Sequence, residues 1–295
     1  MKLFTLVSAW ISVLAEKKGI SEPEINAEII DSAQLSEGDI RGSTYKENTP
    51  IRQEKVFNFK VKNGRKLEER QSRSAIRDYF FRWPHSSFNG GTTEVTIPFE
   101  MEEHMPIITR GISQDAVVNY GLRTCINLKP WQGEEQYIRI YQGGGCYSYI
   151  GWAYYSQQVL SIGSGCNSQV GTFQHEFMHA LGIFHEQSRP DRDTYVYVNM
   201  TNIKPGYEGN FNKYDFEFVS PMDVPYDYES VMHYGPTGFV IDTNGTSIDP
   251  KIPYFSNVIG QRKDFSRNDV AKINRMYKEL HLTFYTDYLY LVLSF

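Results

Sequence analysis

Five residues in one short run have the types and spacing of a metal site: His175, Glu176, His179, Gly182 and His185. Two histidines four residues apart lie one turn apart on the same face of a helix, where both imidazoles can bind one zinc ion. Glu176 follows the first histidine and is placed to take a proton from a water molecule on that metal. Gly182 can adopt a left-handed conformation at little cost, and can therefore turn the chain so that His185 reaches the metal.

An isolated HExxH sequence is a weak signal, because most such matches are ordinary amphipathic helices. The added Gly182 and His185 make a coincidence implausible. Three protein ligands leave one position for water, which is the arrangement of a catalytic zinc rather than a structural one. The sequence therefore predicts one catalytic zinc ion per chain.

The elements before the metal helix are predicted to be mixed. Alternating or apolar runs predict strands at 94–99, 136–141 and 153–162. A helix is expected at 112–122, with Ser113 as its N-cap.

The metal helix itself is expected to begin near Thr172. Beyond residue 193 the chain is rich in Pro, Gly, Asn and Tyr until a final helix at 266–280, where Ser266 and Asp269 form a capping box. We therefore expect an α+β fold in which a mixed first lobe and an irregular second lobe enclose a cleft with the metal at its floor.

The first residues have the pattern of a secretory signal peptide. Lys2 precedes an apolar run at 3–14, and small residues near 13–15 offer a cleavage point. A membrane anchor is the alternative, but the run is shorter than the roughly 20 residues that a spanning helix needs. The net charge of −5, without a long basic block, argues against a nucleic-acid partner. We expect a secreted, extracellular protein with a signal peptide at 1–15 and no membrane partner.

Residues 16–73 have the composition of a pro-segment rather than of a packed domain. Of the 33 residues at 41–73, 14 are charged, and such a composition buries little apolar surface. The segment ends in Arg70-Gln71-Ser72-Arg73, which a processing protease could cut. A solvated linker is the alternative. Because a secreted hydrolase must be kept latent, we expect an activating protease to cut after Arg73.

The histidine signature resembles that of the metzincin zinc peptidases. Glu186 directly after the third histidine, followed by Arg189-Pro190-Asp191-Arg192-Asp193, is similar to the astacins in particular. A second motif, Ser230-Val231-Met232-His233-Tyr234, resembles the astacin Met-turn. The resemblance extends over residues 22–278 and implies a two-lobed peptidase domain at 74–278.

The Met-turn resemblance implies roles for two further residues. Met232 would lie as an apolar base beneath the zinc, and Tyr234 would be a weak extra ligand that swings away to stabilise the tetrahedral intermediate. The alternatives are an ordinary core methionine and a buried structural tyrosine.

The resemblance also implies how the pro-segment acts. Residues 35–40 are similar to the latency motif of the family, whose aspartate occupies the water position on the zinc, and Asp39 is the matching residue. Ser36 stands where the family favours Phe, and a common surface turn is the alternative for this stretch. Cleavage would free Ser74, whose ammonium group would approach Glu186. Without that role, Glu186 would be a surface acid at a helix end.

The chain has three cysteines, an odd number for a secreted protein. The resemblance pairs Cys146 with Cys166 and assigns Cys125 to a long disulfide whose partner should follow the last helix, at 278–279, where no cysteine stands. Cys125 is therefore a free thiol, or the native C-terminus differs. The aromatic tail at 279–295 fits nothing in the family, and we favour a splice variant or a misread gene end.

Further residues have expected roles at the surface and in the cleft. Asn199 and Asn244 begin glycosylation sequons. The substrate is expected to lie extended along the strand at 136–141 as an added strand. Gly260-Gln261-Arg262 resembles the segment that gives several astacins a basic residue in the pocket after the scissile bond, so Arg262 would favour acidic residues there. The alternative is an exposed loop arginine.

The sequence thus predicts the latent precursor of a secreted, zinc-dependent endopeptidase that acts on extracellular proteins or peptides. Glu176 would take a proton from the zinc-activated water and deliver it to the leaving amine. The alternative is a catalytically compromised zinc-binding isoform that lacks one disulfide and either holds a partner or has no function. The intact Glu176 argues against that alternative.

Overall fold

The computed structural model describes only part of the chain, namely residues 35–36, 40–41, 75–76, 81–84, 95–153, 156–163, 165–166, 168–216 and 219–278. Several predicted features lie outside these residues: the signal peptide at 1–15, Asp39, Arg73, Ser74 and the tail at 279–295. Within the described ranges, none of the helices combines the length and the apolar character needed to cross a membrane.

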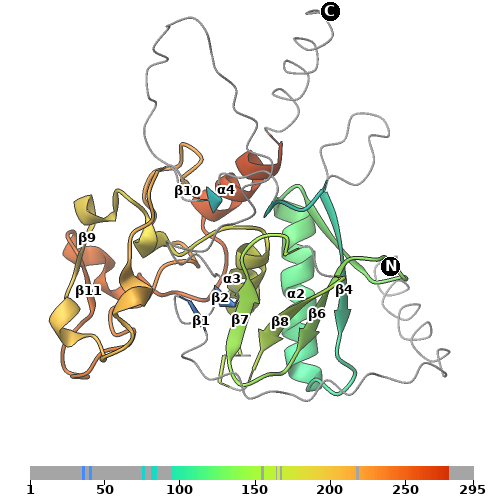
Figure 1. Ribbon diagram of the computed structural model, residues 1–295, viewed down its shortest axis with the longest axis horizontal. Helices are drawn as coiled ribbons and strands as arrows, with labels where there is room; N and C mark the ends of the chain where they lie inside the picture. Colours follow the sequence, from blue (N-terminus) through green and yellow to red (C-terminus); the bar gives the residue numbers. More distant parts are fainter. Residues whose placement is uncertain are drawn as a thin grey trace, which may run out of the picture.

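A seven-stranded mixed sheet forms the first lobe, with the spatial order β1-β2-β7-β8-β6-β4-β5 (Figure 1). Parallel pairs join β4 to β5 and β6, and β6 to β8, whereas β7 runs antiparallel to β8. The strands are β1 (Leu35–Ser36), β2 (Ile40–Arg41), β4 (Val95–Met101), β5 (Ile126–Pro130), β6 (Tyr137–Tyr141), β7 (Cys146–Tyr149) and β8 (Gln157–Ile162).

Two helices, α2 (Ile107–Arg123) and α3 (Val170–Ala180), pack against the strands and against each other. Successive side chains of a strand face opposite sides, so alternate apolar residues can form a buried layer. Ile97 of β4 and Ile138 of β6 belong to this layer and share one core with Phe177 of α3. Burying each such side chain contributes about 1.5–3 kcal/mol to folding.

Helix α2 begins five residues before the predicted position. Its N-cap is Pro106, and the predicted cap Ser113 instead lies inside the helix, where its hydroxyl donates to the carbonyl of Thr109 at 2.8 Å. The prediction of the cap was wrong because a serine hydroxyl can bond back to a carbonyl four residues earlier as well as cap a helix. The first turn was not predicted because its apolar residues, Ile107 and Ile108, are exposed and so do not follow the pattern of a core-facing helix.

The second lobe is mostly irregular, as predicted, and has its own aromatic core. Short two-stranded sheets join β9 (Val196–Val198) to β11 (Ile248–Pro250) and β10 (Val219–Ser220) to β3 (Ala75–Ile76). The same lobe contains 3-10 turns at Glu186–Ser188, Arg192–Thr194, Met200–Asn202, Glu208–Phe211 and Pro253–Asn257. The aromatic side chains of this core include Phe211, Tyr226, Tyr228 and Tyr234.

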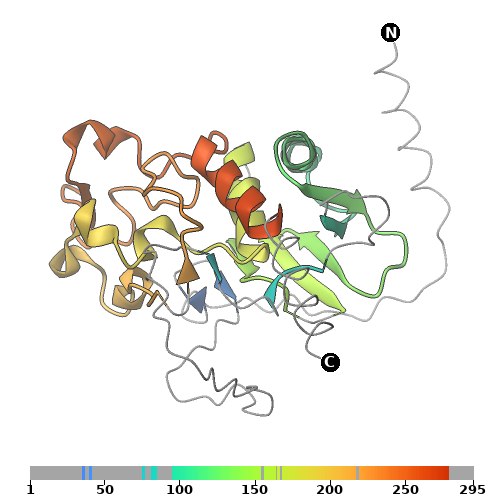
Figure 2. The same ribbon diagram turned by 90° about the horizontal axis from the view of Figure 1, so that it is seen from above.

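The last helix, α4 (Arg267–Lys278), returns to the first lobe and lies beside α3 (Figure 2). Ser266 and Asp269 form the predicted capping box: each backbone N–H donates to the side chain of the other residue at 2.9 Å. The hydroxyl of Tyr277 donates to the carbonyl of Leu181, just beyond α3, at 2.8 Å. The predicted α+β fold with two lobes is confirmed, and α4 connects them.

The predicted substrate strand at 136–141 is wrong. Strand β6 lies between β8 and β4, so both of its edges are already hydrogen-bonded within the sheet. Beyond β8 the sheet continues with β7, and β7 is joined on its other side by β2. This last pair is parallel, with Ile40 opposite Ser148 and Arg41 opposite Tyr149.

Two glycine-to-alanine substitutions should have opposite effects on stability. A Cβ atom at Gly171, in the first turn of α3, would overlap the backbone of Arg262, whose carbonyl accepts the Gly171 N–H at 2.9 Å. Gly171→Ala should therefore lower the free energy of unfolding by about 1–3 kcal/mol. Gly111 in α2 has open space around it, so Gly111→Ala should raise that free energy by about 0.5–1 kcal/mol.

Urea unfolding of both variants checks this prediction. Equal changes in the two variants would contradict it, because helix propensity alone would then explain both.

Candidate metal centre

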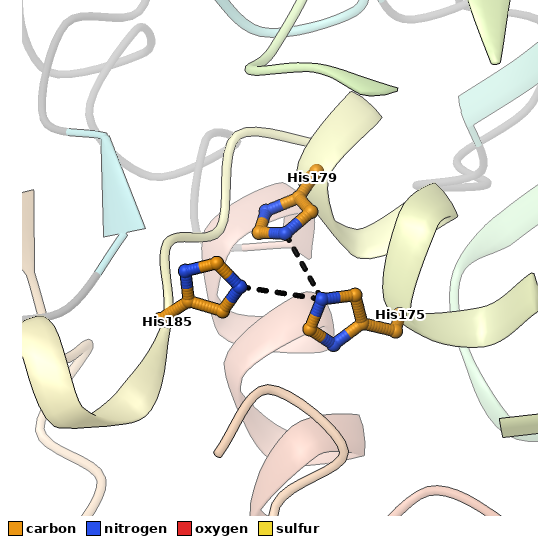
Figure 3. Close-up of side chains that lie close together, drawn as sticks. All are labelled: His175, His179 and His185. Carbon is orange, nitrogen blue, oxygen red and sulfur yellow. Dashed lines mark hydrogen bonds between the residues drawn. The ribbon is translucent and has the colours of Figure 1, made fainter. Parts of the chain in front are cut away.

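Helix α3 supplies the first two histidines. His175 and His179 lie one turn apart, with their Nε2 atoms 3.1 Å apart (Figure 3). Both rings are buried, as is every residue of the helix from Gly171 onward. Because this helix is buried on all sides although it carries polar side chains, its polar groups must find partners inside the protein.

Gly182 ends this helix and turns the chain towards the metal site. Its φ is +97°, a left-handed conformation that glycine adopts without the Cβ clash of other residues. The Ile183 N–H donates to the carbonyl of Met178 at 3.0 Å, which satisfies a free carbonyl at the helix end. His185 then lies with its Nε2 3.3 Å from Nε2 of His175. The predicted role of Gly182 is confirmed.

Two backbone carbonyls fix the tautomers of the histidines. Nδ1 of His175 lies 2.6 Å from the carbonyl oxygen of Val231, and Nδ1 of His179 lies 2.9 Å from that of Ile183. A carbonyl can only accept, so each of these two Nδ1 atoms carries a proton, and Nε2 is the ring nitrogen left to bind a metal. Nitrogens of His175, His179 and His185 lie within 4.8 Å of one another. Such converging imidazoles, two of them oriented by outer hydrogen bonds, fit a zinc ion.

The turn at Ser230–Tyr234 is a rigid base for the site. The Met232 N–H donates to Oγ of Ser230 at 3.0 Å, and the carbonyl of Met232 accepts the Glu186 N–H at 3.0 Å. The ring of Tyr234 lies 4.5 Å from that of His185. Met232 is fully buried. The turn therefore contacts His175, through Val231, and His185, through Tyr234.

The predicted base, Glu176, is buried on α3 directly after His175. Arg262, the predicted pocket residue, is half-buried, and one of its guanidinium nitrogens donates to the carbonyl of His233 at 3.1 Å. The structure thus places Arg262 against the same turn that carries Tyr234. Asn199 and Asn244 are exposed on the second lobe.

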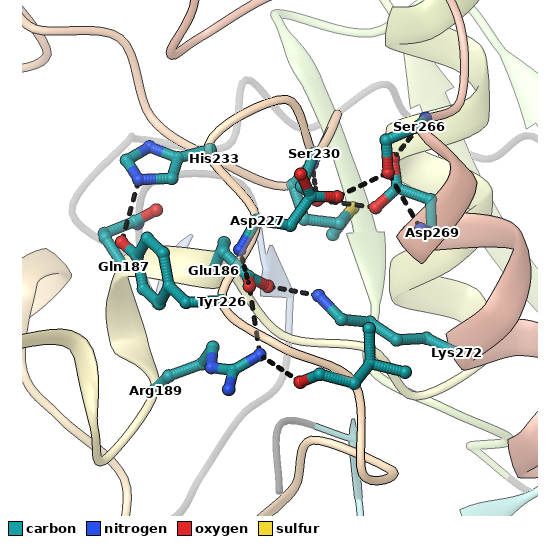
Figure 4. A network of polar contacts seen from close by, with 12 residues as sticks. Glu186, Gln187, Arg189, Tyr226, Asp227, Ser230, His233, Ser266, Asp269 and Lys272 are labelled. Atoms are coloured by element: carbon teal, nitrogen blue, oxygen red, sulfur yellow. Dashed lines mark hydrogen bonds and ion pairs between the residues drawn. The ribbon is translucent and has the colours of Figure 1, made fainter. Parts of the chain in front are cut away.

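Glu186 lies fully buried between two cations (Figure 4). Arg189 donates to one carboxylate oxygen at 3.1 Å, and the ammonium of Lys272 contacts the other. Burial alone would raise the pKa of Glu186, but Lys272 and Arg189 outweigh it and lower the pKa. Among the described residues, Lys272 is a partner that the sequence analysis did not foresee, because a lysine is rarely buried and this one is buried completely.

Two further buried carboxylates both accept hydrogen bonds from Ser266 (Figure 4). Its hydroxyl donates to Asp227, and its backbone N–H donates to Asp269. Asp269 also accepts hydrogen bonds from the hydroxyl of Ser230 at 2.6 Å and from the N–H of Val231 at 3.0 Å. Burial, followed by the charge of Asp269, raises the pKa of Asp227 to about 6. Asp269 was predicted only as part of a helix cap, and nothing in the sequence indicated its contact with the Met232 turn.

The cysteines divide as the resemblance implies. Cys146 and Cys166 form a disulfide. Cys125 is buried and takes no part in a disulfide among the described residues, and its N–H donates to the side chain of Asn274 on α4 at 2.8 Å. The position expected for its disulfide partner, 278–279, falls at the described end of α4, where the sequence has Lys278 and Glu279.

Comparison with known proteins agrees with this geometry. Residues 90–278 match the family model Astacin, which describes a peptidase family. The chain is 44% identical over 212 residues to Meprin A subunit beta of Mus musculus, which covers 72% of this chain and 28% of the meprin. It is 38% identical over 207 residues to Zinc metalloproteinase nas-4 of Caenorhabditis elegans, covering 70% of this chain and 62% of that protein.

Among solved structures, the chain resembles High choriolytic enzyme 1, a hatching enzyme zinc-protease from Oryzias latipes. The identity is 36%, the TM-score is 0.63, and the match covers 69% of this chain and 98% of the other. The chain therefore spans nearly all of this compact protease but little more than a quarter of the meprin, 28%.

Asp227→Asn should make stability less dependent on pH. Because the folded-state pKa of Asp227 is about 6, the folded protein keeps a proton that the unfolded chain releases near its ordinary pKa of about 3.9. The contribution of this carboxyl is present below about pH 4 and is lost as the pH rises through 6, a loss of about 3 kcal/mol at about 1.4 kcal/mol per pKa unit. Urea unfolding should show that, from pH 4 to pH 7, the free energy of unfolding of the variant rises by this amount relative to that of the wild type.

The groups that face Asp227 are Asp269, Lys272 and Glu186, and all of them remain in the variant. The exposed Asp115 provides the control, since Asp115→Asn should differ from the wild type equally at both pH values. A difference for Asp227→Asn that stays constant between pH 4 and pH 7 would contradict the prediction.

Proposed function

Because the chain belongs to the astacin family of zinc peptidases, we propose that it is an endopeptidase that hydrolyses peptide bonds in extracellular proteins or peptides. The observation that carries the proposal is the convergence of three histidine nitrogens beside a buried glutamate. His175, His179 and His185 would hold one zinc ion. When bound, zinc lowers the pKa of a water molecule on it and polarises a carbonyl group.

The residues of this chain would carry the proton transfers and stabilise charge. Glu176 takes the proton of the attacking water and delivers it to the amine that leaves. Tyr234, whose ring packs against His185, donates its hydroxyl to the oxyanion that develops at the scissile carbonyl. Met232 and Glu186 support the site without touching the substrate.

The substrate is proposed to pair with β7 at the edge opposite β8. Of the strands described in this sheet, β2 is the one that pairs with that edge, and the rest of the sheet apart from β1 lies on the β8 side. Main-chain hydrogen bonds to a sheet edge bind a peptide whatever its side chains, and separate pockets give selectivity. Arg262 is proposed to supply such a pocket, for an acidic side chain directly after the scissile bond.

The pairing of β2 with β7 supports a latent precursor. Residues 40–41 occupy the same edge that we assign to the substrate, and Asp39 immediately precedes them. We propose that the pro-segment at 16–73 covers the cleft, that Asp39 takes the water position on the zinc, and that cleavage after Arg73 releases it. A signal peptide at 1–15 would direct the chain to secretion.

Maturation is proposed to place Ser74 close to Glu186. The support is that the next residue, Ala75, is buried and bridges Ile183 and Ser220. Because Lys272 and Arg189 already neutralise Glu186, the ammonium of Ser74 would add to an existing ion pair network. The alternative of a zinc-binding protein without activity is not favoured, since it gives no reason to keep Glu176.

The decisive experiment is peptide-library cleavage by the secreted chain after processing at Arg73. The wild type should cleave, with a preference for Asp or Glu after the scissile bond that weakens in Arg262→Gln. Glu176→Ala should lower kcat by about 10²–10⁴-fold, the usual contribution of a general base, while one zinc ion per chain remains bound.

The exposed Glu103 gives the control, since Glu103→Ala should cleave like the wild type. Zinc bound without any cleavage in the wild type would refute the peptidase, and undiminished turnover in Glu176→Ala would refute the assigned base.

A further inference from the structure

One amide group connects Tyr234 to the rest of the site. The carbonyl of His233 and the N–H of Tyr234 belong to a single planar peptide unit. The Tyr234 N–H donates to Oε1 of Gln187 at 3.0 Å, and the His233 carbonyl accepts from Arg262 at 3.1 Å. Both polar atoms of the unit are therefore held, each by a different segment of the chain.

Gln187 is itself rigidly placed. It is fully buried, and its carbonyl accepts a hydrogen bond from Arg192 at 3.0 Å. The residue before it is fixed by the hydrogen bond from the Glu186 N–H to Met232. Gln187 also follows the ligand His185 by only two positions, so the segment that delivers the third histidine also holds the backbone of Tyr234.

The side chain of Tyr234 lies among other rings. It packs against His185, Phe211 and Phe239, with ring centroids at 4.5, 5.7 and 5.7 Å. A hydroxyl that stabilises an oxyanion must lie within a few tenths of an ångström of its place, because a hydrogen bond weakens steeply outside its preferred geometry. Because the side chain turns about its own Cα, the position of the backbone decides which places the hydroxyl can reach.

We propose that Gln187 and Arg262 are positioning residues for Tyr234, which hold both ends of the preceding amide and so fix, relative to the three histidines, the backbone from which the Tyr234 side chain turns. The inference rests on the proposed role of Tyr234 in peptide hydrolysis. A simpler reading is that Gln187 only satisfies a buried N–H, which any protein interior requires. The two readings differ in what they predict for the transition state.

The test compares Gln187→Met, which keeps length but removes the acceptor, with Gln187→Glu, which keeps an acceptor oxygen. In the processed, zinc-loaded protein, Gln187→Met should lower kcat by about tenfold or more, a part of the 10²–10³ that a whole oxyanion donor supplies, and leave KM within about twofold. It should weaken binding of a phosphinic peptide, a tetrahedral mimic of the transition state, by a similar factor. Zinc content should not change, and Gln187→Glu should recover most of the loss.

One double variant and one control variant separate positioning from general damage. In Tyr234→Phe, the added Gln187→Met should have no further effect on kcat or on phosphinic peptide binding, because coupled residues are not additive. Gln158 offers a matched control: it is equally buried, and its side chain holds the carbonyl of Gly151 and the N–H of Ala153. Gln158→Met should lose stability without the selective fall in kcat.

Arg262→Gln adds an independent reading, since it should lower kcat even for peptides without an acidic residue. Equal losses from Gln187→Met in the wild type and in Tyr234→Phe would overturn the inference, as would a wild-type kcat in Gln187→Met. If Tyr234→Phe itself kept full kcat and phosphinic peptide affinity, the proposed role of Tyr234 would fail, and the inference with it.

Discussion

The metal site depends on a chain of hydrogen bonds that begins at the buried carboxylate of Asp269. That carboxylate accepts from the hydroxyl of Ser230, whose oxygen accepts the Met232 N–H. The carbonyl of the same amide, that of Val231, accepts Nδ1–H of His175. Each bond polarises the next, so the carboxylate on α4 helps to orient His175, the first of the proposed zinc ligands, and makes its Nε2 a better donor to a metal.

Buried charge also joins the two lobes. Glu186 follows the last histidine, and its carboxylate is shared by Arg189 from the second lobe and Lys272 from α4. Removing charges from water costs several kcal/mol per ion, and breaking such a pair costs about 3–5 kcal/mol. The network is therefore a specific attachment between lobes rather than a general source of stability, because any displacement of α4 would take Lys272 away from the buried carboxylate of Glu186.

The parts of the site that the sequence predicted are those determined by local geometry. The spacing of His175 and His179, the turn at Gly182 and the cap at Ser266 each depend on residues a few positions apart. The contacts of Lys272, Asp269 and Gln187 could not be predicted in this way, because each partner is distant in the chain. The substrate edge was misplaced for the same reason: alternation along β6 shows that a strand is buried on one face, but not which strands flank it. Strand β7, with Cys146 and two tyrosines, carried too weak a pattern to be predicted.

The position of Asp269 near the end of the described chain has a consequence for how the protein is made. During synthesis, the segment with all three histidines emerges long before α4, and domains fold as their last elements become available. Until α4 docks, the turn at Val231 that orients His175 lacks the carboxylate that holds it, and Glu186 lacks its lysine. Competence to hold metal in the right geometry thus arrives only once α4 has been made and has docked.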